Sequence, residues 1–498
     1  MTRLAFAKPL LWRIFGALGL LVLLVRTAWI SDDAYITFRV IANLLGGYGP
    51  RWNIDDRVQV YTDPLFIGLI SLVTAVTGNM YLSTIALSLV LALITYYFLT
   101  RDAGIFSIAA ATVILIFSKG FIDFSASGME NPLTDCLAVF FFFSFWRGSG
   151  PVRLSLIAAL SAVTRMDTVL LFLPALLFTY WRAGWQAWKQ VLWKQVLAAW
   201  SPFAAWCVFA VVYYGFLFPN TAYCKLAAGI PSRALMVQGL LYYFNSFRHD
   251  TVTLVAIAAG LLVAALFREY LAGLGVLLYL LYVVRVGGDF MSSRFFTLPL
   301  VVSVMLIVRH WKPRLLVGVP ALCAVAAIGF LIPHPTVLSA VADYHLPKVV
   351  DWDGIADERA AYYRWTGLLN YRTDRVWPEH PSALLGYKLQ QQGVKCYTWG
   401  QIGMIGYMNG RTTHFIDPYG LADAFLARLP IPPGPWRVGH YKRALPAGYE
   451  DTVLTGANHM TDPQLAERYR RMQIVIAGDL WSRDRWALIV QSWLPTGS

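Results

Sequence analysis

Charged residues are scarce in this chain. Lys, Arg, Asp and Glu together make up 14% of its 498 residues, whereas a soluble globular protein has about 25%. Four of the five cysteines lie in or beside apolar segments and no two form a CxxC pair, so neither a disulfide framework nor a CxxC metal site is expected. A P-loop and a GxGxxG fingerprint are also missing, so neither nucleotide-binding motif is present. The low charged fraction is unusual for a soluble domain and favours a membrane protein.

Long apolar runs make up much of the sequence. Hydrophobic residues are 57% of the chain and the mean hydropathy is +0.54. A membrane-spanning helix needs about 20 apolar residues, and about eleven runs come near that length. They lie at 10–30, 81–100, 104–118, 132–147, 153–165, 168–181, 196–216, 251–267, 270–286, 295–309 and 314–333. The sequence therefore predicts a polytopic α-helical membrane protein, with the short run 64–78 as a re-entrant or juxtamembrane helix.

Basic residues predict the orientation of these spans. They recur in alternate loops, which places those loops in the cytoplasm: Arg101, Arg147, Arg153, Arg182, Lys189, Lys194, Arg268, Arg309, Lys312 and Arg314. The net charge of +13 is therefore explained by membrane topology and by attraction to anionic lipids. We expect the lipid bilayer as a partner, and no nucleic acid. The Trp-rich segment 181–194 predicts a helix in the cytoplasmic interface. We expect a location in the inner (cytoplasmic) membrane.

The remainder of the chain is polar. With an odd number of spans, residues 334–498 lie outside the cytoplasm, as a periplasmic α/β domain that follows a membrane domain at 1–333 with a first outer loop at 31–80. We expect strands at Val394–Thr398, Thr412–Ile416 and Met472–Ala477. Helices are expected at Ile402–Met408 and Leu421–Leu429.

Asp32 and Asp33 are the first candidates for chemistry, just beyond the outer end of the first span. Adjacent carboxylates repel each other and are usually held by a cation. They offer hard oxygen ligands for Mg²⁺, Mn²⁺ or Ca²⁺, so a divalent cation is one expected cofactor. Alternatively, one of them removes a proton from a hydroxyl group. The structural alternative is an acidic first turn of a helix.

Other polar residues fall in loops on the same predicted side. Lys225, Arg294 and Arg165 are cations suited to a phosphate group. A second set is suited to substrate binding: Arg39, Tyr61, Glu130, Asp167, Asn220, Tyr223 and Asp289. Each also has a structural interpretation, such as an ion pair of Arg165 with Asp167 or of Asp289 with Arg294. Their shared side of the membrane is what favours a site.

Several strings in these loops resemble a known family. "SDDAYITFRVIANLLGGYGPRWNIDDRVQVYTDPLF", "SGMENPL", "TRMD", "PNTAYCKL", "GGDFMSSRFF" and "GQIGMIGYMNGRTTHFIDPYGLAD" are similar to bacterial polyprenyl-phosphate arabinofuranosyltransferases of GT-C type. That group includes the actinobacterial terminal arabinofuranosyltransferase and pilin arabinosyltransferases. The resemblance covers about residues 30–425. Two departures stand out, "TRMDT" in place of Thr-Arg-Pro-Asp-Gly and Val60 in place of a usual Gly.

The resemblance implies a GT-C fold with a periplasmic active site. Asp32 and Asp33 match the family's acidic pair, held essential for transfer. The implied donor is a polyprenyl-phosphate sugar, with arabinofuranose favoured, and the implied acceptor is a cell-envelope glycan or a pilin-like protein. Transfer of another sugar, such as mannose or glucose, is the first alternative. A transporter or flippase of a lipid-linked saccharide is the second, although the spans carry no obvious string of charges.

Overall fold

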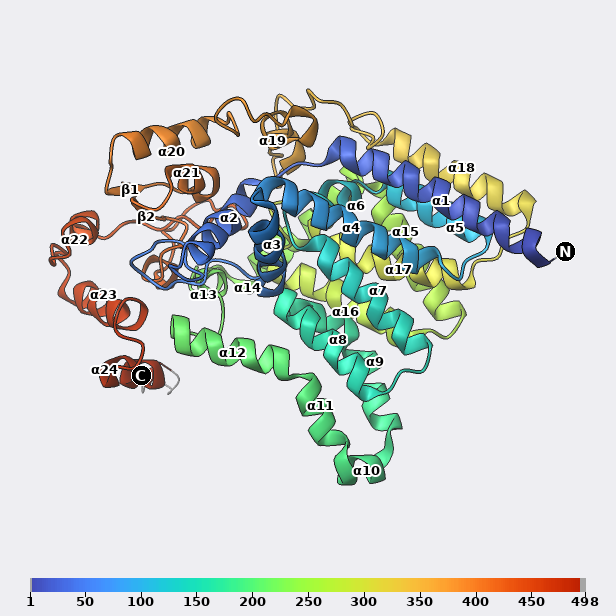
Figure 1. The fold of residues 1–498 in the computed structure, drawn as a ribbon, viewed down its shortest axis with the longest axis horizontal. Coiled ribbons are helices and arrows are strands. Elements are labelled where there is room, and N and C mark those ends of the chain that lie inside the picture. The colour runs from blue at the N-terminus through green and yellow to red at the C-terminus, as the bar shows by residue number, and fades with distance from the viewer. Residues whose placement is uncertain (1, 493–498) are drawn as a thin grey trace. The chain divides into compact units, whose positions relative to one another are not determined.

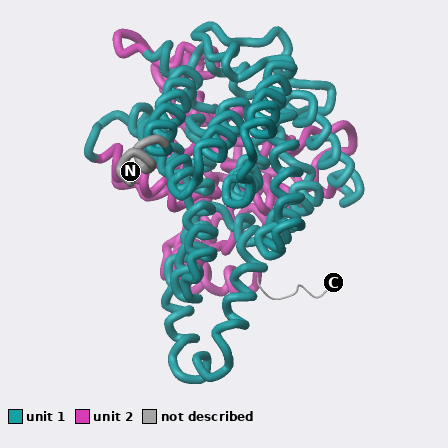
Figure 2. The backbone as a smooth tube through the Cα atoms, turned by 90° about the vertical axis from the view of Figure 1, so that its right-hand side faces the viewer, with its two compact units in different colours: residues 1–31, 76–203, 231–371 teal, residues 32–75, 204–230, 372–498 magenta. Residues whose placement is uncertain are grey.

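The computed structural model describes residues 2–492, and its regular elements are helices apart from two short strands (Figure 1). The chain forms two compact units, coloured separately in Figure 2. Unit 1 comprises residues 1–31, 76–203 and 231–371, and unit 2 comprises 32–75, 204–230 and 372–498. Residues 334–371 thus belong to the first unit. The assignment of 1–333 to the membrane and of 334–498 to the periplasm stays a prediction.

Apart from isolated bridges of Ala356 with Met291 and Val350, the described elements of unit 1 are helices. They are α1 (Thr2–Thr27), α4 (Met80–Thr100), α5 (Ile105–Phe117), α6 (Lys119–Phe124), α7 (Asn131–Trp146), α8 (Pro151–Thr164), η1 (Met166–Thr168), α9 (Val169–Arg182), α10 (Gly184–Ala187), η2 (Trp188–Leu192), α11 (Trp193–Ala199), α14 (Ser232–His249), α15 (Thr251–Leu266), α16 (Tyr270–Val286), η3 (Arg294–Phe296), α17 (Thr297–His310), α18 (Leu315–Leu331), α19 (Glu358–Thr366) and η4 (Leu368–Asn370).

Helix α17 forms the centre of unit 1. Every residue from Thr297 to Val308 is buried, as expected for a helix that is apolar on all sides. It packs against α15, α7, α5 and α16. Helix α5 also packs against α1 and α18, which run beside it in Figure 1. This packing brings the ends of α7, α8, α16 and α17 into one cluster of loops, where the candidate site residues of the unit lie.

Few of the described helices meet a strict test for crossing a membrane. By length and composition, Pro9–Thr27 and Met80–Thr100 are long and apolar enough. Two bent pairs raise the number to four if each pair is one span, namely Gly184–Ala199 with Ser201–Tyr214 (52°) and Ser232–His249 with Thr251–Leu266 (109°). The other apolar helices that come close are shorter, with 10–17 residues. The count of about eleven spans stays a prediction.

Unit 2 combines helices with a small sheet. Its elements are α2 (Asp32–Leu45), most of α3 (Pro64–Thr77) and of α12 (Ser201–Tyr214), α13 (Asn220–Leu226), α20 (Pro381–Gln391), β1 (Cys396–Thr398), α21 (Ile402–Asn409), β2 (His414–Ile416), η5 (Leu426–Arg428), α22 (Tyr449–Thr455), α23 (Pro463–Ile476) and α24 (Arg483–Gln491). The two strands are parallel, with Cys396 opposite His414, and α21 is the crossover between them, as parallel strands require. Helices α2 and α20 both pack on α21.

The predicted strand–helix–strand order at 394–416 is confirmed, and 64–78 is a helix as expected. Two other predictions are wrong. Residues 421–429 form only the short η5, because the Asp417 carboxylate accepts the N–H groups of Leu421 and Ala422 and holds a turn instead. The expected strand 472–477 is the end of α23, which Asp462 caps and Pro463 opens. Helix propagation there overrides the strand propensity of Ile-Val-Ile.

Candidate functional site

The predicted site residues divide between the two units. Unit 1 holds Glu130, Arg165, Asp167, Asp289 and Arg294. Unit 2 holds Asp32, Asp33, Arg39, Tyr61, Asn220, Tyr223 and Lys225. That both sets share one compartment stays a prediction.

In unit 1 all five predicted residues meet in a single cluster, here called the Glu130 cluster. Glu130 directly precedes α7, and Arg165 directly follows α8. Asp167 lies in η1, while Asp289 follows α16 and Arg294 opens η3. Three loops separated along the sequence are therefore brought together by the ends of four packed helices.

Glu130 is at the centre of this cluster. Its Oε1 accepts hydrogen bonds from Arg165 Nη1 at 3.0 Å and from Arg294 Nη2 at 2.9 Å. Arg165 also pairs with Asp167, with Nη2 2.6 Å from Oδ2, and Arg294 Nη1 lies 3.2 Å from Asp289 Oδ2. Three carboxylates thus surround two guanidinium groups. The ion pairs form one continuous series, Asp167–Arg165–Glu130–Arg294–Asp289.

The side chains of the Glu130 cluster are largely buried. The Glu130 side chain is 2% exposed, and those of Arg165 and Arg294 are 13% and 9% exposed. Both arginines donate hydrogen bonds to carboxylates, so neither guanidinium group is free to bind a phosphate. The ion pairs that the sequence offered as the structural alternative are therefore present. A phosphate would have to compete with carboxylates already in place.

A second buried network in unit 1 was not predicted from the sequence. The Lys119 ammonium group contacts the carboxylate of Asp123 and lies 3.1 Å from Asp357 Oδ2. Arg359 Nε donates to Asp123 Oδ1 at 2.5 Å, and its other donors reach Ser339. Two cations balance two anions here. The i,i+4 spacing of Lys119 and Asp123 between two apolar runs is the only local signal of this pair.

In unit 2, Asp32 holds the start of helix α21. Its Oδ1 accepts the Met404 N–H at 2.9 Å and its Oδ2 the Gly403 N–H at 3.3 Å. A carboxylate at a helix N-terminus satisfies N–H groups that the helix leaves unpaired. Burial raises the pKa of Asp32 above its ordinary value, and the two N–H groups oppose this effect. Asp32 therefore serves as a structural acceptor between α2 and α21.

The contact between α2 and α21 depends on a glycine, which leads to a first prediction. A Cβ atom on Gly403 would lie 1.9 Å from the backbone oxygen of Asp32, closer than any real contact. We expect Gly403→Ala to separate the two helices and to lower the midpoint of thermal unfolding. The matched control is Gly68→Ala, in helix α3 of the same unit, where an added Cβ meets nothing within 4 Å. A Gly403→Ala midpoint no lower than that of the control would contradict the prediction.

Arg39 and Tyr61 also have structural partners in unit 2. The Arg39 guanidinium stacks 3.9 Å from the centre of the Trp52 ring and donates to the carbonyls of Trp52, Gly406 and Thr413. The Tyr61 hydroxyl lies 2.7 Å from that of Tyr214. Both side chains are buried. Their predicted role in substrate binding stays a prediction, with all the Arg39 nitrogens already used.

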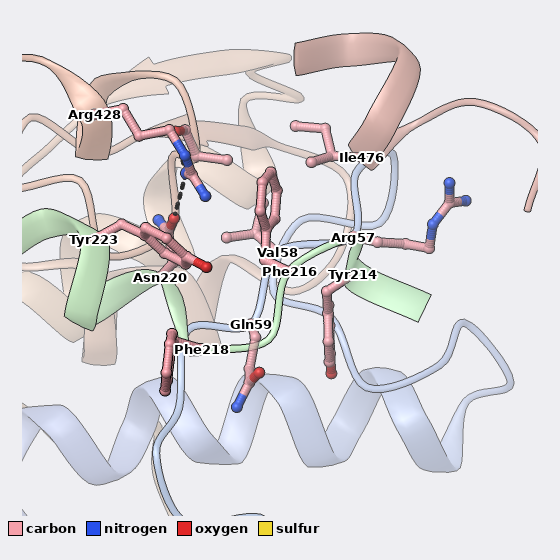
Figure 3. Close-up of a pocket in the computed structure, with 11 residues that line it drawn as sticks. Arg57, Val58, Gln59, Tyr214, Phe216, Phe218, Asn220, Tyr223, Arg428 and Ile476 are labelled. Carbon is pink, nitrogen blue, oxygen red and sulfur yellow. Dashed lines mark hydrogen bonds between the residues drawn. The ribbon is translucent and has the colours of Figure 1, made fainter. Parts of the chain in front are cut away.

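Asn220 and Tyr223 line a small crevice (Figure 3). Asn220 Nδ2 donates to the carbonyls of Gly420, Leu421 and Asp423, and its Oδ1 accepts from Arg428 Nη1 at 3.1 Å. Arg428 stacks 4.2 Å from the Tyr223 ring and its Nη2 has no hydrogen-bond partner among the described residues. Lys225 is exposed on the same helix, α13. Arg428 was not among the predicted residues.

One group in unit 2 has the residue types of a metal site. Among residues 2–492, the only set of three or more His, Cys, Asp or Glu side chains with ligand atoms within 4.8 Å of one another is Asp55, Asp56 and His414. His414 Nδ1 lies 2.8 Å from Asp55 Oδ2. Burial raises the pKa of Asp56 to about 7. Asp32 and Asp33, the predicted ligands, belong to no such set of three among the described residues.

No family model matches the chain. Two proteins named terminal beta-(1->2)-arabinofuranosyltransferase are similar to it, one from Corynebacterium glutamicum at 28% identity over 358 residues and one from Mycobacterium tuberculosis at 27% over 326. The alignments cover 57% and 55% of this chain. The chain spans about half the length of these curated relatives, 49% and 51%.

Among solved structures, two resemble the chain at a TM-score of 0.47 and 11% identity, each covering 82% of it. One is an oligosaccharyltransferase from Archaeoglobus fulgidus in complex with an inhibitory peptide and a dolichol-phosphate, matched over 65% of its length. The other is ArnT from Cupriavidus metallidurans bound to undecaprenyl phosphate, matched over 85%. The predicted resemblance to arabinofuranosyltransferases is confirmed by the sequence relatives.

Proposed function

We propose that this chain is a membrane glycosyltransferase that transfers a sugar from a polyprenyl-phosphate donor to a cell-envelope acceptor. One observation carries the proposal: 28% identity over 358 residues to a protein named as an arabinofuranosyltransferase. D-arabinofuranose is accordingly the proposed sugar. The apolar composition and the helices of sufficient length support a location in the membrane. We place the reaction on the periplasmic face of the inner membrane, with about eleven spans.

The reaction makes modest demands on the protein. A sugar phosphodiester already carries a good leaving group, so the protein needs to stabilise the departing phosphate and to accept a proton from the attacking hydroxyl group. We assign the proton transfer to Asp33, because the neighbouring Asp32 carboxylate is buried and occupied by two N–H groups of α21. Lys225 is exposed and, among the described residues, has no hydrogen bond or ion pair, so it is the proposed contact for the phosphate.

A transfer assay tests this function. The full chain is purified in detergent and incubated with radiolabelled polyprenyl-phosphoryl arabinose and an arabinan oligosaccharide. Parallel reactions use the mannose and glucose donors. Label should move to the acceptor only from the arabinose donor. Transfer from a hexose donor instead would change the sugar and keep the class. Movement of the donor across liposomes without any transfer would favour a flippase and reject the proposal.

A further inference from the structure

The group Asp55, Asp56 and His414 lies against β2 in unit 2. His414 is the first residue of that strand, and Asp55 and Asp56 lie in the loop that follows α2. Asn53, in the same loop, ties this loop to the strand: its Oδ1 accepts the Phe415 N–H and its Nδ2 donates to the Phe415 carbonyl. These two hydrogen bonds between the Asn53 side chain and the backbone of Phe415 hold the loop that carries both carboxylates beside the imidazole.

Asp56 differs from the other buried carboxylates of this unit. It is 6% exposed, yet its Oδ1 is buried and accepts no hydrogen bond from the described residues. By contrast, Asp32, Asp417 and Asp423 each accept at least two hydrogen bonds. A buried carboxylate without hydrogen bonds is costly unless it is protonated or bound to a cation. Asp56 thus has a buried oxygen without a hydrogen-bond partner among the described residues, and one of its carboxylate oxygens lies within 4.8 Å of ligand atoms of Asp55 and His414.

The set of donor atoms indicates the kind of cation. Ca²⁺ and Mg²⁺ prefer oxygen ligands alone, whereas imidazole together with carboxylates suits Mn²⁺, Zn²⁺ and similar metals. Three protein ligands also leave positions for water or another ligand. The Asp55 side chain is 60% exposed, which gives a route from solvent. Binding through His414 Nδ1 would place the ring proton on Nε2, and the 3.3 Å contact with Asn53 Nδ2 is long enough to be given up.

We propose that Asp55, Asp56 and His414 bind one divalent transition-metal ion of the Mn²⁺ or Zn²⁺ type. The site uses none of the residues to which the proposed transfer reaction is assigned. It can therefore exist whether or not that reaction is the correct one. The bound metal ion links the loop after α2 to strand β2 and neutralises two adjacent carboxylates.

Manganese binding to the purified full chain tests this site directly. After treatment with a chelator and its removal, Mn²⁺ is titrated in and the free ion is followed by electron paramagnetic resonance. We expect one saturable ion per chain, displaced by Zn²⁺, which binds such ligands more tightly, but not by Mg²⁺ in excess. Asp55→Asn should weaken Mn²⁺ binding by at least about tenfold, because it removes a ligand.

Asp374→Asn is the matched control. That carboxylate is also exposed, at 72%, also lies in unit 2 and neighbours a basic residue. It should leave Mn²⁺ binding unchanged. Asp55 is on the surface, so its variant is expected to fold even if a change at buried Asp56 does not. Absence of saturable binding by the wild-type chain, or equal affinity in Asp55→Asn, would overturn the site and leave Asp56 as a neutral acid. Neither result would bear on sugar transfer.

Discussion

Asp33→Asn should leave the chain folded and reduce sugar transfer by about 100- to 10,000-fold, the usual contribution of a general base. Asp32 and Asp33 are neighbours at the start of α2, and successive residues on a helix point about 100° apart. Asp32 points to the N-terminus of α21, so Asp33 presents its carboxylate in a different direction. Transfer of label from polyprenyl-phosphoryl arabinose measures the effect, with the unfolding midpoint recorded for the same sample.

Asp32→Asn provides the comparison. It keeps one oxygen for the Met404 N–H but loses the second acceptor, at Gly403. We expect a stability loss of about 1 kcal/mol, as for a weakened helix cap, and a fall in transfer smaller than that of Asp33→Asn. Wild-type turnover by Asp33→Asn, or a larger loss in Asp32→Asn at unchanged stability, would reverse the assignment within the pair.

Local sequence signals predicted much of this structure, and the reason is physical. Apolar runs bounded by Gly, Pro and charged residues gave most helices of unit 1, because burial of apolar surface sets where they begin and end. The Arg165–Asp167 pair was offered as an alternative because the two residues are neighbours in the chain. Helix α14 (Ser232–His249) was not predicted, since its residues are less apolar than those of the other helices.

Contacts between distant residues could not be predicted in this way. His414 and Asp55 are 359 positions apart, and Asp32 and Met404 are 372 apart. No spacing rule connects such pairs, so the eight histidines look scattered until the fold places one beside two carboxylates. For the same reason the sequence does not distinguish Asp32 from Asp33, which are the same residue type. Only the fold shows that Asp32 is the one that contacts α21.

The second large effect concerns stability. Glu130→Ala should lower the free energy of unfolding by about 3–5 kcal/mol, because removal of one partner leaves buried charges uncompensated. In this case the change takes the shared acceptor from both Arg165 and Arg294. Asp167 and Asp289 would still neutralise one arginine each, which sets the expected loss toward the lower end of that range. Unfolding in detergent by titration with sodium dodecyl sulfate measures it.

Glu467→Ala is the control for this prediction. Glu467 pairs with Arg470 on the surface, with side chains 53% and 64% exposed, and an exposed pair contributes about 0–1 kcal/mol. Its loss should therefore be small. If Glu130→Ala cost no more than Glu467→Ala, the Glu130 cluster would not be a structural ion-pair network. Its two arginines would then be available for a phosphate after all, and the donor site would be sought in unit 1.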